Sequence, residues 1–406
     1  MRQALRSRAI RTFAVTQFLL EVQFWFPVWL IYLLDLGFPL TTAVLADGVF
    51  RIVSVACEFP LGVVGDLLGR RRTYLALAGA TIVTYAAITQ IHSVGVLFGV
   101  WVLWGVQWAL GSGAASTYLY ELCAVQQPQV DPAKAFGLVR AVGNVAVLLS
   151  LLAAGYLYDV DPRLPFAITA GLAVVAFLLA LTLPEVARPR VVPTLGALVA
   201  DVRAVAADPR VRRVVWLGAL LLLFGWSARI LFQPLALELG LSPEVTGWMY
   251  AVFAAASVAG GLAAGYLATR RRAALTVVFV LLLVPLVATA RLTWLGPFLF
   301  LPILGFAYAL GTTVLEVLTN EVTPRAVRGM VFGLVTCLGG IGIAVARPGL
   351  GVVADQRSVA FGFALWAAIG IPVLALAAPA IRRLRPGRPP APAVPPLDEP
   401  SGAARP

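Results

Sequence analysis

The chain has 406 residues, of which 60% are hydrophobic and only 12% are charged. A soluble domain carries about 25% charged residues, so this sequence has too little charge to cover a water-exposed surface, and its mean hydropathy of +0.91 points to lipid as its main solvent. The net charge of +12 raises the question of a nucleic-acid partner, which the positions of the basic residues answer below.

Long apolar runs dominate the chain, without the alternation of apolar and polar residues that a lipid-facing β-barrel strand requires. About 20 apolar residues suffice for a helix to cross the bilayer. We therefore predict an all-α membrane protein with twelve transmembrane helices. In chain order the predicted spans are 12–34, 41–65, 73–92, 95–121, 135–158, 163–183, 212–236, 243–268, 273–290, 295–319, 329–353 and 359–380.

The basic residues are distributed unevenly across the predicted membrane. Of the 31 Lys and Arg residues, 24 fall in loops and tails on one side and three, Arg163, Arg291 and Arg357, on the other. Cytoplasmic loops carry the excess of Lys and Arg, so we predict a multi-pass protein of the inner (plasma) membrane with both termini in the cytoplasm. The positive charge then forms a collar against the lipid bilayer, and nucleic acid is not an expected partner.

The longest internal loop divides the chain into two halves that resemble each other. Residues 105–111 read Gly-Val-Gln-Trp-Ala-Leu-Gly and residues 305–311 read Gly-Phe-Ala-Tyr-Ala-Leu-Gly, and Glu121 corresponds to Glu321. Parallel repeats of this kind place a binding site between the halves near the membrane midplane. We predict a six-helix bundle at 1–183, a cytoplasmic linker with an amphipathic helix at 184–211, a second six-helix bundle at 212–380 and a disordered cytoplasmic tail at 381–406.

Enzymatic chemistry is not expected. The chain has one His and three Cys that lie far apart, so neither a metal site nor a disulfide pattern is predicted. No nucleophile with a base and no phosphate-binding loop is found, so no cofactor is predicted. The N-terminus runs into a long span without a small-residue cleavage site, so no cleavable signal peptide is expected.

The segment between the second and third spans carries a recognisable motif. Residues 62–72 read Gly-Val-Val-Gly-Asp-Leu-Leu-Gly-Arg-Arg-Arg. This resembles the loop 2–3 signature of the major facilitator superfamily, in which Gly62, Asp66, Gly69, Arg70 and Arg71 match, and it departs at Leu67, where the family usually has a basic residue. The repeat and the six-plus-six arrangement are also similar to that family.

The resemblance implies two pseudo-symmetric six-helix bundles that alternate access by rocking, in a monomer that resembles bacterial efflux-type members. It implies that spans 1, 4, 7 and 10 line the cavity and that spans 2, 5, 8 and 11 form the contact between the halves. It also implies that Asp66 engages the start of span 11 near Arg328, where a helix N-terminus favours an acid, and latches the outward-facing state. A second family signature, Arg-x-x-Gln-Gly, is incomplete here, because Gln107 is present but Trp104 replaces the Arg.

Ionisable residues inside the spans are the main candidates for function. Each costs at least about 2.5–3.5 kcal/mol in a membrane helix, so such residues normally face the bundle interior. Helical spacing places Glu21 on one face with Gln17 and Trp25, where burial favours a neutral carboxyl group that can bind a proton or a cationic substrate. Glu58 and Glu316 are further proton-coupling candidates. Structural ion pairs between helices are the alternative role for such charges.

Aromatic stripes accompany these charges in two predicted cavity helices. Span 4 carries Trp101, Trp104 and Trp108 beside Gln107, and span 7 carries Trp226, Arg229 and Gln233. Core or lipid packing is the alternative role of such a stripe, but aromatic walls suit flat apolar or cationic ligands. The predicted substrate cavity comprises Glu21, Trp25, Trp101, Trp104, Gln107, Trp108, Trp226, Arg229 and Gln233.

Two charge pairs are predicted to act as gates. Asp47 in span 2 and Arg347 in span 11 lie at similar depth on helices that face each other in the family, and we predict that they close the outer mouth. Arg140 in span 5 and Glu316 in span 10 lie near the cytoplasmic side and are predicted to close the inner mouth.

These observations favour a secondary active transporter, with proton-coupled export of small amphipathic molecules as the first hypothesis. The alternative is uptake or exchange of an organic anion or another small nutrient, with Arg229, Arg51 or Arg140 as counter-charges. The charge of the substrate discriminates between them, because a Glu21 site favours cations and an Arg229 site favours anions. Few Asn, Gln and Asp residues lie in spans 1, 4, 7 and 10, which argues against a sugar porter.

Overall fold

The computed structural model describes residues 6–112, 114–123, 127, 130, 132–186, 203, 207–267, 270–291, 296–323 and 328–384. Within these residues the chain is helical and contains no strand. The predicted amphipathic helix of the linker and nearly all of the predicted tail lie outside the described residues. Helix α17 continues to Arg382, so the helical part ends slightly later than predicted.

The first half of the chain contains the helices of the six predicted N-terminal spans, with spans 1 and 4 each divided into two helices. These helices are α2 (Arg8–Leu20) and α3 (Trp29–Asp35), α4 (Leu40–Leu68), α5 (Arg70–Ile88), α6 (Val94–Gly111) and α7 (Ala114–Glu121), α8 (Pro132–Val160) and α9 (Leu164–Ala180).

The second half repeats this order, and here span 7 is the divided one. Its helices are α11 (Pro209–Ser227), the 3-10 helix η2 (Ala228–Leu231) and α12 (Phe232–Glu238), α13 (Pro243–Tyr266), α14 (Arg271–Arg291), α15 (Gly296–Val322), α16 (Arg328–Gln356) and α17 (Val359–Arg382).

Nine helical stretches of the described chain are long and apolar enough to cross a membrane. The other three predicted spans are helical but differ in detail. Span 1 is interrupted between α2 and α3, α5 has 19 residues and opens on three arginines, and α9 has only 17 residues. Twelve spans are therefore consistent with the structure.

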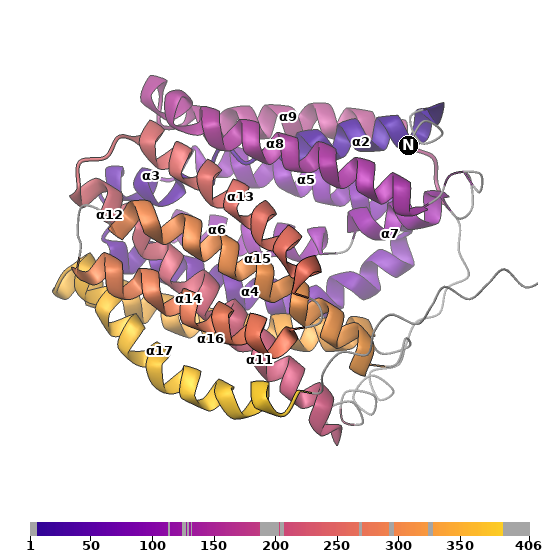
Figure 1. Cartoon of the computed structure of the whole chain (residues 1–406). Coiled ribbons are helices and arrows are strands. Elements are labelled where there is room, and N and C mark those ends of the chain that lie inside the picture. The colour runs from indigo at the N-terminus through magenta and orange to yellow at the C-terminus, as the bar shows by residue number, and fades with distance from the viewer. Residues whose placement is uncertain are drawn as a thin grey trace, which may run out of the picture.

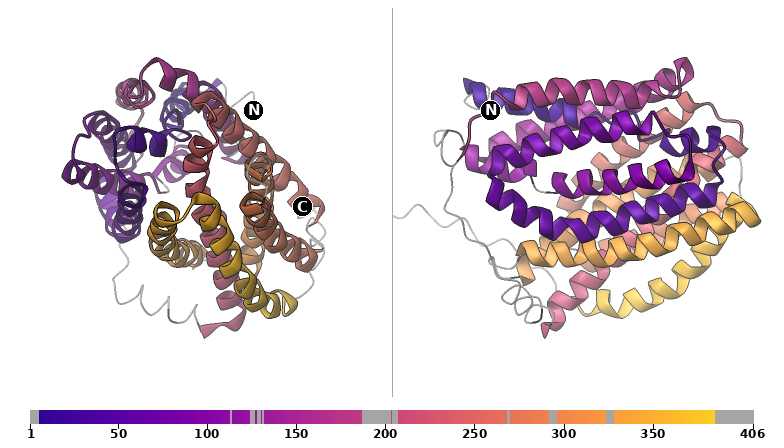
Figure 2. Two further views of the ribbon diagram at one scale, coloured as in Figure 1. Left: turned by 90° about the vertical axis from the view of Figure 1, so that its left-hand side faces the viewer. Right: turned by 180° about the vertical axis from the view of Figure 1, so that it is seen from behind.

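The helices run along one common axis, and the two halves lie side by side (Figure 1). Viewed end-on, the helices of the first half gather on one side and those of the second half on the other (left view in Figure 2). Contacts between the halves are made mainly by α4 with α16 and by α8 with α13. These are spans 2, 11, 5 and 8.

The two ends of the bundle differ in charge. The end where α2, α5 and α14 begin and α17 ends carries Arg8, Arg70–Arg72, Arg271, Arg272 and Arg382, and we call it the arginine-rich end. The other end carries the connections after α3, α5, α8, α12 and α16, and we call it the opposite end. In Figure 1 the N-terminus marks the arginine-rich end, and α3 and α12 lie at the opposite end.

The halves touch closely at the opposite end. A Cβ on Gly155 of α8 would lie 2.3 Å from backbone atoms of Glu244 in α13, and a Cβ on Gly247 would lie 2.7 Å from the carbonyl oxygen of Leu151. On the other side of the interface, the Asp355 carboxylate accepts a hydrogen bond of 2.7 Å from the backbone N–H of Thr41, at the start of α4. These helices cannot approach further.

Toward the arginine-rich end α8 and α13 diverge (Figure 1). No described atom lies within 4 Å of the Cβ position of Gly62 in α4, Gly137 in α8 or Gly333 in α16. Within the described residues the bundle is thus closed at the opposite end and open at the arginine-rich end.

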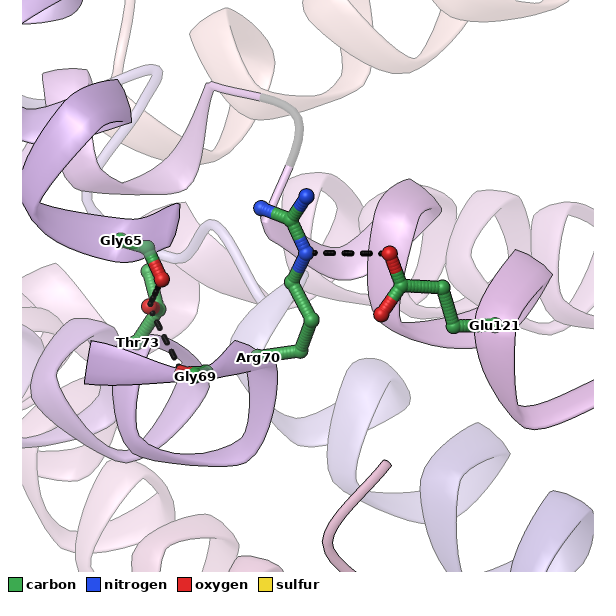
Figure 3. Close-up of polar contacts among 5 residues, drawn as sticks. All are labelled: Gly65, Gly69, Arg70, Thr73 and Glu121. Atoms are coloured by element: carbon green, nitrogen blue, oxygen red, sulfur yellow. Dashed lines mark hydrogen bonds and ion pairs between the residues drawn. The ribbon is translucent and has the colours of Figure 1, made fainter. Parts of the chain in front are cut away.

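The signature motif forms the tight turn between α4 and α5. Gly69 has a φ of 94°, a conformation that glycine adopts without strain. The Thr73 hydroxyl lies 3.2 Å from the carbonyl oxygen of Gly65 and 3.0 Å from that of Gly69, so it holds the turn closed (Figure 3). Arg70 then points to the buried Glu121, with its Nε 3.2 Å from the carboxylate (Figure 3).

The second half repeats this anchoring one residue out of register. Arg271, and not Arg270, pairs with Glu321 through two hydrogen bonds. Arg71 donates to the carbonyl of Leu181 after α9, and Arg272 donates to that of Leu384 after α17. Both bundles therefore use arginines at the start of their third span as scaffold.

Candidate functional site

A deep cavity of about 380 Å³ lies between the two halves, beneath the closed opposite end. It is lined from both halves, and its walls are mainly aromatic. The aromatic lining residues are Trp25, Phe26, Trp29, Phe50, Trp104, Trp108, Trp226, Tyr250, Phe253 and Tyr308. The charged lining residues are Asp47, Arg51, Arg229 and Arg347.

Spans 1 and 7 are both interrupted where they reach this cavity. Helix α2 ends at Leu20 and α3 begins at Trp29, while span 7 tightens into the 3-10 helix η2 at Ala228–Leu231. A proline lies within or just after each interruption, Pro27 and Pro234. Proline removes a backbone donor and crowds the preceding turn, so Pro27 and Pro234 weaken the α-helical hydrogen bonding next to them, Pro234 from the first turn of α12.

The interruption changes the predicted face of span 1. Glu21 is the C-cap residue that follows α2, so Trp25 and Trp29 do not continue its helical stripe, and the prediction of one continuous face is wrong. Glu21 keeps the predicted neighbour Gln17, whose Nε2 donates to it at 2.7 Å. The Tyr74 hydroxyl donates to the Oε1 of Gln17 at 2.9 Å, which fixes the orientation of the amide.

Gln233 of α12 supplies the hydrogen bonds that the broken backbone of span 1 lacks. Its Nε2 donates to the carbonyl of Phe26 at 3.1 Å, and its Oε1 accepts from the N–H of Leu30 at 3.0 Å and of Ile31 at 3.4 Å. The side chain is only 3% exposed. The Gln233 side chain therefore joins the two halves on the side of the cavity that faces the opposite end of the bundle.

Arg229 extends from η2 into the cavity between two aromatic rings. Its guanidinium carbon lies 3.7 Å from the centroid of Trp226 and 4.6 Å from that of Phe26, which belongs to the other half. The residue is only 7% exposed. Among the described residues no carboxylate lies within 4 Å of it.

Arg51 of α4 approaches the same space from the first half. Its guanidinium carbon lies 5.3 Å from the ring centroid of Phe50 and 5.5 Å from that of Trp226. Its Nε is buried and has no hydrogen-bond partner within the described structure. Arg51 also has no carboxylate within 4 Å among the described residues.

The structure brings Asp47 and Arg347 together as a buried ion pair between α4 and α16. The Arg347 side chain also donates to the carbonyl of Trp226 at 3.0 Å, near the end of α11. Spans 2, 7 and 11 therefore meet at this pair, which forms part of the cavity lining.

The second predicted gate pair is not formed. Arg140 and Glu316 are both exposed, and they line separate side cavities, one in each half. Arg140 shares its cavity of about 510 Å³ with Glu21, and Glu316 lies in one of about 190 Å³. Arg140 and Glu316 are thus apart in this state, in which the arginine-rich end is open. The side chains of Asp66 and Arg328, the predicted latch, lie outside what the structure describes.

A vestibule of about 520 Å³ adjoins the deep cavity on the side of the arginine-rich end. Trp25, Arg51, Trp108 and Trp226 line both spaces. Glu21, Glu58 and Gln107 line the vestibule but not the deep cavity. Glu58 accepts a hydrogen bond of 2.6 Å from the Ser112 hydroxyl, and Gln107 donates to Thr81 at 3.1 Å. The two carboxylates therefore lie on the route to the deep cavity, and not beside Arg229.

The predicted tryptophan stripe of span 4 is only partly in the cavity. Trp104 and Trp108 line it, whereas Trp101 does not and packs in the core against Trp29 and Trp104, with centroid distances of 5.9 and 5.2 Å. Sequence reasoning missed Phe26, Tyr250 and Tyr308 as lining residues. Pro27 was the available signal for Phe26, because a break in span 1 turns the preceding side chain toward the cavity.

Comparisons with known proteins agree with this architecture. The model of the major facilitator superfamily matches residues 13–237 and 215–403. No curated protein sequence matches the chain.

Solved transporter structures superpose on almost the whole chain. The nucleoside transporter NupG is 17% identical, with a TM-score of 0.75 over 93% of this chain and all 100% of its own. A D-xylose-proton symporter is 13% identical, with a TM-score of 0.67 over 91% and 96% of the two chains. The human organic anion transporter MFSD10 is 17% identical, with a TM-score of 0.62 over 93% and 99%. These matches confirm the predicted all-α fold.

Proposed function

The chain belongs to the major facilitator superfamily of transporters, and from that premise we propose that it carries small amphipathic organic anions by alternating access. The observation that carries this proposal is Arg229, a buried cation between two rings with no carboxylate partner among the described residues. An anionic group of the cargo supplies the missing partner. The aromatic walls accommodate its apolar body.

This proposal combines the two hypotheses drawn from the sequence. The aromatic cavity supports the amphipathic cargo of the first hypothesis, and the unpaired arginines support the anion of the alternative. Glu21 lines the vestibule and not the deep cavity that Arg229 lines, so its carboxylate does not supply the partner of Arg229.

We further propose that the arginine-rich end faces the cytoplasm, in keeping with the excess of basic residues in cytoplasmic loops. The described state is then open to the inside. Export is the favoured direction for an anionic cargo, because a membrane potential that is negative inside drives each negative charge outward by about 2.3 kcal/mol per 100 mV.

Replacing Arg229 with Gln is expected to remove anion binding. Hydrogen bonds to a charged group contribute about 1.5–3 kcal/mol, so affinity should fall roughly 10-fold to 150-fold. The measurement is a thermal-shift titration of purified protein with 2-naphthoate, 2-naphthylmethanol and 2-naphthylmethylamine, which share one ring system and differ in charge. Wild type should be stabilised most by the acid.

The matched control is Arg291→Gln, which removes an exposed arginine at the end of α14, outside the cavity. It should bind 2-naphthoate as wild type does. Equal stabilisation by the amine and the acid, or an unchanged response in Arg229→Gln, contradicts the proposal.

Proton coupling is proposed to depend on Glu21, which lies in the vestibule with its carboxylate held by Gln17. Glu21→Gln cannot release or bind a proton, so it should abolish accumulation of labelled substrate driven by an imposed pH gradient in proteoliposomes. Counterflow, which exchanges labelled for unlabelled substrate without net proton movement, should persist.

Glu238→Gln, at the exposed last residue of α12, is the matched control and should retain both activities. If Glu21→Gln still accumulates substrate in response to the pH gradient, Glu21 is not the coupling residue. Glu58→Gln is then the next variant for the same assay.

A further inference from the structure

The deep cavity contains more positive than negative charge. Its charged lining residues are three arginines and one aspartate. Asp47 is engaged by Arg347. Arg51 and Arg229 therefore remain, and neither has a carboxylate within 4 Å among the described residues. The charged side chains that line the deep cavity therefore carry a net charge of +2, with Asp47 shared between Arg347 and its helix neighbour Arg51.

These two arginines face the same small space. Both guanidinium carbons lie over the ring of Trp226, Arg229 at 3.7 Å and Arg51 at 5.5 Å from its centroid. The two groups are therefore no farther apart than the sum of these distances. They come from different halves, Arg51 from α4 and Arg229 from η2.

Aromatic rings compensate such charges only in part. The face of a ring attracts a cation through its quadrupole, but it carries no net charge. A cation that is removed from water and lacks a charged partner is strongly disfavoured. The Nε of Arg51 is also buried and lacks a hydrogen-bond acceptor within the described structure. Neutralising the cavity requires two negative charges.

We propose that the cargo is a dianion, with two negative charges at one end of an aromatic or other flat apolar body, as in an aryl phosphomonoester or an aromatic dicarboxylate. This rests on the proposed function and narrows its substrate class. Arginine suits both head groups, because its planar fork binds carboxylate and phosphate oxygens in pairs. One head group spans Arg51 and Arg229, and it thereby contacts both halves at once.

The test compares ligands with one ring system and different head groups by calorimetry at pH 8, where a phosphomonoester is doubly charged. The probes are 1-naphthyl phosphate, naphthalene-2,3-dicarboxylate and 1-naphthoate. We expect at least one of the two dianions to bind wild type about 10-fold or more tightly than 1-naphthoate, and the tighter one identifies the head group.

The variant Arg51→Gln removes one of the two charges and should abolish the preference. We expect the dianion and 1-naphthoate to bind it within about 3-fold of each other, while Arg51→Lys retains a preference for the dianion. Thermal melting without ligand checks folding. Removing an unpaired buried charge should not lower the melting temperature of Arg51→Gln, so a lost preference reports on binding.

Two results overturn the inference and are distinguishable from failure of the proposed function. If 1-naphthoate binds wild type as tightly as both dianions, the cargo class is a monoanion and organic anion transport stands. If Arg51→Gln keeps the full preference for the dianion, Arg51 does not hold the second charge. If none of the anions binds and 2-naphthylmethylamine does, the proposed function itself fails.

Discussion

Replacing Asp47 with Asn is expected to open the end of the transporter that is closed in this structure. The substitution leaves the Arg347 guanidinium buried without its carboxylate, and breaking a buried ion pair in this way costs about 3–5 kcal/mol. Inverting a two-state equilibrium from 99:1 to 1:99 takes about 5.5 kcal/mol, and half of that value already makes the two states equally populated. The loss of one ion pair is therefore large enough to change which state dominates.

The opening can be measured as a distance between spin labels at the opposite end. Suitable positions are His92 in the first half and Arg357 in the second, both exposed, in a background where Cys57, Cys123 and Cys337 are replaced by Ser. Asp47→Asn should shift the distances to longer values, and the double variant Asp47→Arg with Arg347→Asp should restore the shorter ones. The control Glu238→Gln should leave them unchanged. If the charge swap restores nothing that the single change lost, the pair is not a gate.

Replacing Gly155 with Leu is expected to hold the halves apart and stop transport. Its Cβ would lie 2.3 Å from the backbone of Glu244, and backbone atoms cannot turn aside as a flexible side chain can. Closure at the opposite end is needed once in every transport cycle, so counterflow should fall to about one-hundredth of wild type or less, because about 3 kcal/mol of strain suffices for that factor.

Gly171→Leu in α9 is the matched control, because no described atom lies within 4 Å of its Cβ position. It should transport normally. The same spin-label distance should lengthen in Gly155→Leu and stay unchanged in Gly171→Leu. Normal counterflow in Gly155→Leu would show that the close approach of α8 and α13 is not required.

The fold was predictable because hydropathy and the signature motif are properties of local sequence. Asp47 and Arg347 could be placed opposite each other because a charged residue deep in a membrane span needs a partner. The family resemblance then indicates which helices face each other. The positions of Glu21 and Trp101 were harder to predict from the sequence. Regular helical periodicity was assumed through span 1, although Pro27 breaks it, and a tryptophan stripe at spacings of three and four is wide enough to face both cavity and core.

The open end of the molecule could not be predicted from sequence. A transporter must adopt both states with similar free energies, so one sequence encodes contacts for each. Arg140 and Glu316 illustrate this, because each is placed where a gate could form, yet in this state each faces its own side cavity. Which contacts are made at one moment depends on small differences in free energy that residue patterns do not express.

The hydrogen bonds of Gln233 have a consequence for the opening of the opposite end. If the amide moves away as the opposite end opens, the carbonyl of Phe26 and the N–H groups of Leu30 and Ile31 lose their partner at a place that is buried in this state. An unsatisfied backbone group in such surroundings costs several kcal/mol, so solvent must enter as the amide departs. We therefore expect hydration of the broken segment to accompany opening, and turnover to depend on water activity on that side of the membrane.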